Sequence, residues 1–144
     1  MKNILCALLI IALPGIYKAQ TKKLSGPLDG KTFTVDLFKE GKKKPLDADE
    51  LKFIGGKFKS THFADWGYTK ASIYQITSVD STSASKTYVW TCESINDIKD
   101  KMIWSGTITG DDIEGTCKEG VNENGESKYS YTFTGKLKKK PGQK

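Results

Sequence analysis

The chain has 144 residues, of which 37% are hydrophobic, and its 23 basic and 17 acidic residues give a formal charge of +6. This length allows one domain with a modest core. All the basic residues are lysines. Because the planar guanidinium of arginine is the usual means of recognising phosphates and base edges, its absence argues against a protein that binds nucleic acid.

The first 19 residues have the pattern of a secretory signal peptide. Lys2 gives a basic start, residues 4–16 are almost wholly apolar, and Ala19 is a small residue before Gln20. The apolar run is shorter than the roughly 20 residues that a membrane-spanning helix needs, so we expect no stable membrane insertion. Cys6 lies inside this run rather than after it, which argues against lipidation. We predict cleavage near Ala19-Gln20 and a secreted or periplasmic location; a buried N-terminal helix is the alternative.

Removal of residues 1–19, which carry two lysines and no acidic residue, lowers the formal charge from +6 to +4 and leaves 125 residues. We predict one domain over residues 20–137, because Leu137 is the last residue that fits its strand pattern. The predicted remainder, residues 138–144, is a basic disordered tail. Its consecutive lysines repel one another, and Pro141 cannot donate to a strand ladder.

Apolar and polar residues alternate in eight segments, as in β-strands with one buried face. In chain order the alternating positions are Phe33, Val35 and Leu37; Leu51 and Phe53; Phe58; Ser72, Tyr74 and Ile76; Tyr88, Trp90 and Cys92; Met102, Trp104, Gly106 and Ile108; Ile113, Gly115 and Cys117; and Tyr129, Tyr131, Phe133, Gly135 and Leu137. The inner face of the fourth segment is ambiguous, since Ile73 interrupts its pattern. No segment keeps helical spacing for long enough to predict an amphipathic helix.

Short turns join most of these segments. The turn signals are Glu40-Gly41, Gly55-Gly56, Gly110-Asp111 and Asn124-Gly125. Strands joined in this way pair with their sequence neighbours, and eight of them can close into a barrel that holds side chains or one small ligand. We therefore predict an all-β protein, an eight-stranded antiparallel meander β-barrel, and expect a monomer. A two-sheet β-sandwich is the alternative.

The turn at Gly110-Asp111 predicts a register for the sixth and seventh strands. It places Thr109 opposite Asp112, Ile108 opposite Ile113, Gly106 opposite Gly115, and Trp104 opposite Cys117. The opposed glycines leave a gap on the inner face, which indicates either a sharp bend of the barrel or a niche for a ligand.

Cys92 and Cys117 are an even pair in a chain predicted to enter an oxidising compartment, so we predict a disulfide between them. The predicted register opposes this pairing. One strand separates the two cysteines, and next-nearest strands lie roughly 9–10 Å apart. A disulfide needs Cα atoms within about 4.4–6.8 Å, so the bridge requires a strand end that bends inward or a different topology.

Ser60, His62 and Asp65 are residue types that form a nucleophile, a base and an orienting acid. Side chains so close in an extended segment point along one face rather than at one another, so we predict a strand-end histidine instead. One histidine without a C-x-x-C pair offers too few ligands for zinc, and hairpin turns account for the carboxylates at 111–114 and 122–126. We predict no catalytic residue, no metal and no cofactor.

The aromatic residues are the remaining indication of a binding site. Six are predicted on the inner face: Tyr88, Trp90, Trp104, Tyr129, Tyr131 and Phe133. Such a row inside a small barrel can line a ligand pocket with polar handles. A filled aromatic core without a cavity is the alternative.

Two stretches resemble known β-barrel families. Residues 28–33, Leu-Asp-Gly-Lys-Thr-Phe, resemble the glycine-then-aromatic opening of the calycins, which include lipocalins and fatty-acid-binding proteins. Residues 104–116 are similar to a W-x-G-x-V-x-G-D-x-I-x-G-T pattern of small exported bacterial lipocalin-like proteins. Phe33 stands where lipocalins have tryptophan, and the lipocalin arginine near the last strand is absent. The resemblance implies a barrel and a small-molecule ligand, and it implies no catalytic residue.

These observations predict an exported, non-catalytic protein that binds a small apolar or amphipathic ligand inside the barrel. The alternative is a closed barrel that acts as a protein- or glycan-interaction module through its loops. Trp66, in Ala-Asp-Trp-Gly-Tyr at 64–68, is the predicted exposed anchor for that alternative.

Overall fold

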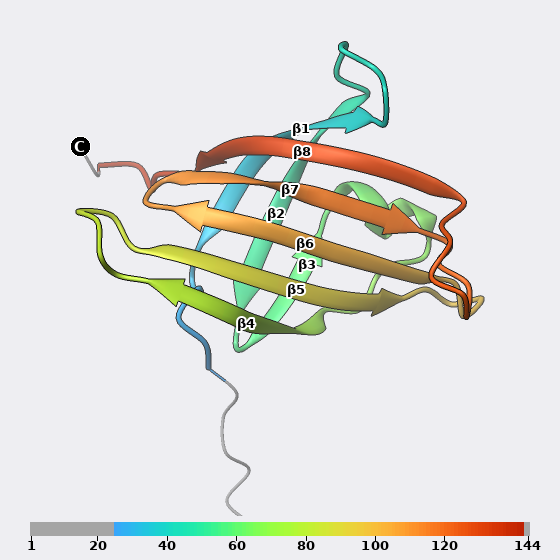
Figure 1. Cartoon of the computed structure of the whole chain (residues 1–144), viewed down its shortest axis with the longest axis horizontal. Coiled ribbons are helices and arrows are strands. Elements are labelled where there is room, and N and C mark those ends of the chain that lie inside the picture. The colour runs from blue at the N-terminus through green and yellow to red at the C-terminus, as the bar shows by residue number, and fades with distance from the viewer. Residues whose placement is uncertain (1–24, 143–144) are drawn as a thin grey trace, which may run out of the picture.

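The computed structural model of the protein describes residues 25–142. Eight strands form a closed antiparallel barrel in which each strand pairs with its sequence neighbours and the last returns to the first (Figure 1). The elements are β1 (Thr32–Lys39), β2 (Asp47–Ile54), β3 (Lys57–Ser60), the 3-10 helix η1 (His62–Trp66), β4 (Ser72–Asp80), β5 (Thr87–Ile95), β6 (Lys101–Thr109), β7 (Asp112–Glu119) and β8 (Tyr129–Leu137). The predicted barrel is confirmed, and the sandwich alternative is wrong.

The predicted signal peptide, with its cleavage site near Ala19-Gln20 and Cys6, lies outside the described residues. In the part that is described, no helix has the length and apolar character that a membrane span requires.

β1 and β8 close the barrel over seven paired positions, from Phe33–Leu137 to Lys39–Tyr131. β8 ends at Leu137, where the predicted domain ends. The next residue still bonds to the barrel, since the Lys138 N–H donates to the Thr32 carbonyl at 2.7 Å. The chain therefore enters and leaves the barrel at the same end.

The β6–β7 hairpin has the predicted register at every position. Thr109 pairs with Asp112, Ile108 with Ile113, Gly106 with Gly115, and Trp104 with Cys117. The predicted inner positions of β1, β2, β6 and β7 carry the core residues Phe33, Val35, Leu37, Leu51, Phe53, Met102, Trp104, Ile108, Ile113 and Cys117, all of which are buried. Alternation and turn chemistry were sufficient to predict this half of the barrel.

The contact between β3 and β4 is the weakest join of the barrel. β3 has four residues and pairs with β4 at two positions, Lys57–Ile73 and Phe58–Ser72. β4 continues along β5 as far as the Asp80–Thr87 pair. The β4–β5 hairpin therefore extends past the turn between β2 and β3 (Figure 1).

The turn before β1 closes the end at which the chain enters. Leu28 is fully buried, and its N–H donates to the Tyr74 hydroxyl at 3.2 Å. The Asp29 carboxylate accepts the N–H groups of Gly56 at 2.8 Å and Gly26 at 2.9 Å. The Gly56 N–H in particular holds the pKa of Asp29 below its ordinary value. Tyr74 is buried, which settles the ambiguous inner face of β4.

Candidate functional site

Large aromatic rings fill the middle of the barrel. Six strands and η1 contribute the fully buried rings Phe33, Phe53, Phe58, Phe63, Trp90, Trp104 and Phe133. The ring centroid of Phe58 lies 4.9 Å from those of both Trp90 and Trp104. Rings at such separations are in contact. The centre of the barrel is thus occupied by protein side chains.

The six predicted ligand-binding residues fall into two groups. Trp90, Trp104, Tyr131 and Phe133 are buried on the inner face, and the Phe133 centroid lies 6.4 Å from that of Trp90 and 5.7 Å from that of Trp104. The other two lie at opposite ends of the barrel. Tyr88 is half-buried against the core near the end at which the chain enters. Tyr129, the first residue of β8, is 47% exposed, with Lys39 Nζ 5.1 Å from its ring centroid.

The gap at the paired glycines is filled from within. A Cβ built on Gly106 would lie 2.9 Å from Trp90 Nε1, and one built on Gly115 would lie 2.6 Å from Phe133 Cζ. Both distances are shorter than carbon atoms tolerate without bonding, so the two glycines make room for the Trp90 and Phe133 rings. On the inner face, the close approach of core side chains, and not a ligand niche, explains this pair.

Cys92 and Cys117 are buried and free, so the predicted disulfide is not formed. Both pair with Trp104 in the register, one from β5 and the other from β7, because β6 lies between them. Burial raises the pKa of the Cys92 thiol to about 11 and that of the Cys117 thiol well above its ordinary value. Buried, protonated thiols are inert, so the pair has a packing role.

In the folded protein without residues 1–19, neither thiol should react with a thiol reagent. Both should react after guanidinium unfolds the protein. The measurement is the number of thiols titrated before and after unfolding. Rapid reaction of either thiol in the folded protein would contradict its burial.

The raised pKa values also make the stability of the fold depend on pH. The stability that Cys92 contributes is fully present below its ordinary pKa of 9.0 and is lost as the pH rises through about 11, because only the unfolded state ionises readily in that window. The melting temperature should fall less over this range in Cys92→Ala than in the unmodified protein.

A buried carboxylate fixes the start of η1. Asp49 is 3% exposed and shares the inner face of β2 with Leu51. Its Oδ1 accepts the backbone N–H groups of Thr61 at 2.9 Å and His62 at 2.8 Å, and its Oδ2 accepts the hydroxyl of Ser60. Hydrogen bonds to a charged group are strong, and a buried charge requires them. Asp49 therefore sets the direction in which the chain leaves β3.

The other groups near this carboxylate do not form a nucleophile–base pair. Ser60 bonds to Asp49, whereas His62 Nδ1 lies 3.2 Å from Asp47 Oδ2. Asp65 is exposed on η1. Among residues 25–142, no group of three or more histidine, cysteine and acidic side chains lies close enough together to hold a metal ion.

Phe63 is the residue with which η1 closes its end of the barrel. Its ring is fully buried, and the centroid lies 5.6 Å from that of Trp104 and 5.5 Å from that of Tyr131. Its N–H donates to the Ser60 hydroxyl at 3.2 Å. Phe63 thus contacts two of the predicted ligand-binding residues from inside the barrel, in the position that a ligand entering from this end would take.

Polar groups gather beneath η1. The Tyr131 hydroxyl donates to Glu119 Oε2 at 3.1 Å, and burial raises the pKa of that carboxyl. Burial also raises the pKa of Tyr68 to about 12. The Tyr68 hydroxyl and Trp90 Nε1 are buried without a hydrogen-bond partner. Buried polar atoms are normally bonded, so these two are exceptions. Trp90 Nε1 lies against Gly106 in the middle of the barrel, away from η1.

The η1 end of the barrel also carries exposed apolar side chains. Of eight large hydrophobic residues that are exposed in the described chain, five lie in its loops or strand ends: Leu46, Trp66, Ile95, Ile98 and Tyr129. Trp66 is 46% exposed and Ile98 77% exposed. A Cβ built on Gly67 would lie 3.5 Å from Asn96 Cβ, so the end of η1 lies beside the β5–β6 loop. The predicted exposure of Trp66 is confirmed.

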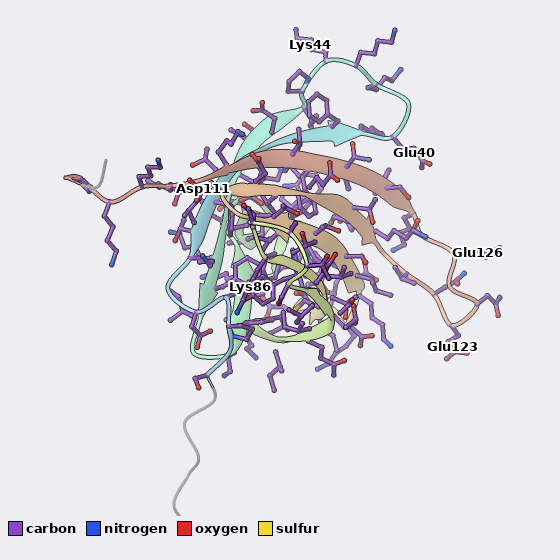
Figure 2. All side chains as sticks on the ribbon, turned by 60° about the vertical axis from the view of Figure 1, so that its left-hand side comes forward. Glu40, Lys44, Lys86, Asp111, Glu123 and Glu126 are labelled. Carbon is purple, nitrogen blue, oxygen red and sulfur yellow. The ribbon has the colours of Figure 1, made fainter. Side chains whose placement is uncertain are left out.

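Two further loops stand out from the barrel at this end. Figure 2 shows the β1–β2 loop with Glu40 and Lys44, and the β7–β8 loop with Glu123 and Glu126, projecting beyond the strands. Lys86 and Asp111 lie at the opposite end, in the β4–β5 loop and the β6–β7 turn. The four loops at the η1 end, β1–β2, η1, β5–β6 and β7–β8, form what we call the loop face.

Acrylamide should quench one of the three tryptophans in the folded protein. Trp66 is exposed, whereas Trp90 and Trp104 are at most 1% exposed. The Trp66→Phe variant should lose the quenchable fraction of the emission and keep the rest, as a Stern–Volmer plot would show. An unchanged quenchable fraction in this variant would place Trp66 in the interior.

Comparison of the chain with protein-family models, with curated proteins and with solved structures finds no match.

Proposed function

We propose that this protein is an exported, non-catalytic binding domain that holds a partner protein on its loop face. The supporting observation is the exposure of Trp66 and Ile98 on adjacent loops of a barrel whose interior is filled. Tryptophan is the residue most enriched among those that dominate protein interfaces, and gathered apolar residues on a surface favour association. The barrel in this proposal is a rigid support for these loops.

The anchor is held in place before any partner arrives. The Trp66 centroid lies 5.4 Å from that of Phe63 and 5.6 Å from that of His62. Phe63 is in turn fixed by the core, and His62 by Asp49. A side chain that is already ordered loses little conformational entropy on binding, so this arrangement favours affinity.

The test uses a photo-crosslinking amino acid at position 98, in the loop face, or at position 86, at the opposite end. In the organism that produces the protein, crosslinking from position 98 should give an adduct of one discrete mass, and crosslinking from position 86 should not. Equal adducts from both positions, or none from position 98, would contradict the proposal.

Two variants sharpen this test. Trp66→Ser should abolish the adduct that forms from position 98. Ile54→Ser removes a residue that is 64% exposed at the far end of β2, so it should leave the adduct unchanged. Loss of the adduct in both variants would indicate a general effect of surface hydrophobicity.

A small apolar or amphipathic ligand inside the barrel is a second candidate function. The unpaired Trp90 Nε1 and Tyr68 hydroxyl support it, since both could bond to polar atoms of a ligand. The resemblance to lipocalins agrees with it. Such a ligand would have to replace Phe63 between Trp104 and Tyr131, so η1 would move outward when the ligand binds.

Native mass spectrometry of protein purified from its own source tests this second candidate. The expected result is an added mass, and tighter binding of a fluorescent fatty-acid probe by Phe63→Ala than by the unmodified protein. A ligand-free mass, together with no response to fatty-acid or retinoid probes in either protein, would exclude it.

A further inference from the structure

A recess with polar and apolar lining lies on the outer face of the barrel, over β6, β7 and β8. It consists of two depressions of about 600 and 480 Å³. Thr107, Glu114 and Thr134 line both of them, so the two depressions meet and form one recess. The other residues around it are Asp36, Phe38, Val89, Ser105, Gly106, Thr109, Asp112, Ile113, Gly115, Thr116, Thr132, Phe133, Gly135 and Lys136.

The strand register aligns the hydroxyl groups of the recess in rows. Ser105, Thr116 and Thr132 are cross-strand partners in β6, β7 and β8. Thr107, Glu114 and Thr134 form the next row, with Glu114 in the middle. Adjacent strands are about 4.8 Å apart, so the recess offers a two-dimensional array of hydroxyls around one carboxylate. Each hydroxyl can both donate and accept a hydrogen bond.

The charge of the recess differs from that of the chain as a whole. It contains the carboxylates of Asp36, Asp112 and Glu114 and one ammonium group, that of Lys136, which is paired with Asp112. Glu114 has no ion pair among the described residues. The whole chain, in contrast, has a formal charge of +6. An anionic ligand is therefore disfavoured in the recess, although the rest of the surface would attract one.

We propose that this recess binds a neutral oligosaccharide. Hydroxyls alternate with apolar groups in the lining of this shallow recess, so it can replace the hydration of a polyhydroxylated ligand and also contact its C–H faces. The carboxylate of Glu114 can accept hydrogen bonds from two neighbouring sugar hydroxyls, and such charge-assisted bonds are strong. Phe38, half-buried at the β1 side, offers a ring to the apolar face of a sugar. This site is separate from the loop face and does not depend on the proposed function.

The test is affinity electrophoresis of the protein without residues 1–19 in gels that contain dextran, laminarin, xylan, dextran sulfate or polylysine. At least one of the three neutral polysaccharides should retard the protein, and high salt should leave that retardation unchanged. Glu114→Ala should weaken it about tenfold or more, which is the loss expected for a hydrogen bond to a charged group.

Glu93→Ala is the matched control. It removes a glutamate at an outward position of β5 that does not line the recess, so binding should stay unchanged. Thr134→Val removes one hydroxyl with little change in shape and should weaken binding without lowering the melting temperature. This variant separates loss of binding from loss of folding.

Three results would overturn the proposal. The first is no retardation by any neutral polysaccharide. The second is retardation by dextran sulfate alone that disappears at high salt, which would assign binding to the lysine-rich surface. The third is retardation by polylysine alone that depends on Glu114, which would make the recess a site for a basic peptide.

Discussion

Gly115→Ala should destabilise the protein by about 4 kcal/mol or more, a loss large enough to unfold most of a domain of ordinary stability. A Cβ at this position would lie 2.6 Å from Phe133 Cζ and 2.7 Å from Gly106 Cα, with the Ser105 carbonyl oxygen closer still. Two of these three atoms belong to the backbone of β6, so rotation of a side chain cannot relieve the clash. Denaturation by guanidinium, followed by circular dichroism, measures the loss.

Gly125→Ala is the matched control. Gly125 lies in the β7–β8 loop at φ +81°, and a Cβ there would meet nothing within 4 Å. The substitution should cost only the penalty for alanine in a left-handed backbone conformation, about 1–2 kcal/mol. Gly115 does not have a left-handed backbone, so a loss at position 115 no larger than the loss at position 125 would show that β6 and Phe133 move to relieve the clash.

Asp49→Ala should cost about 3 kcal/mol or more. The substitution removes the acceptor for the N–H groups of Thr61 and His62 and for the Ser60 hydroxyl. A buried donor left without a partner costs about 1–3 kcal/mol. The variant should also release η1, so that Phe63 no longer seals the barrel. Equilibrium unfolding measures the first effect, and increased amide exchange in residues 61–68 measures the second.

Asp49→Asn and Asp65→Ala serve as comparisons. Asparagine keeps one oxygen acceptor, so its cost should be lower than that of alanine. Asp65 is exposed on the same short helix, and its removal should change stability by about 0.5 kcal/mol or less. Equal losses for Asp49→Ala and Asp65→Ala would show that the helix is held by its ring contacts alone.

The strands and their register were accessible from sequence because each signal in them is local. In the β6–β7 hairpin, Gly110-Asp111 specifies a two-residue turn, and alternation then determines the partner of every residue up to Trp104. A slip of one position would have turned the whole apolar face toward water. Closure of the barrel followed from eight such strands in sequence order.

η1 was not accessible in the same way. Residues 61–70 have no periodic pattern of apolar residues. The hydrogen bonds that fix them run from backbone N–H groups to Asp49, so no side-chain motif predicts the helix. One signal was present: Asp49 is in phase with Leu51 and Phe53, and an acidic residue on an inner face needs buried donors. That signal could have predicted a buried hydrogen-bonded carboxylate at this position, although not the groups that bond to it.

Whether the barrel is hollow could not be predicted from the sequence. The pattern correctly placed Trp90, Trp104, Tyr131 and Phe133 on the inner face, but it could not show whether they leave a cavity. That outcome depends on the volume of all the rings together and on Phe63, which enters from a loop. The gap at Gly106 and Gly115 was likewise visible in the sequence, whereas the rings that fill it come from β5 and β8.

The pairing of Phe33 with Leu137 fixes how the domain is presented to its surroundings. Any chain that precedes β1 and any chain that follows β8 meet the barrel at one pole, beside the β4–β5 loop and the β6–β7 turn (Figure 1). A tether at either terminus would therefore suspend the barrel in the same orientation. In both cases the loop face, which carries Trp66 and Ile98, would lie at the opposite end of the strands. In the proposed function, the loop face would therefore stay accessible to a partner whichever terminus is attached.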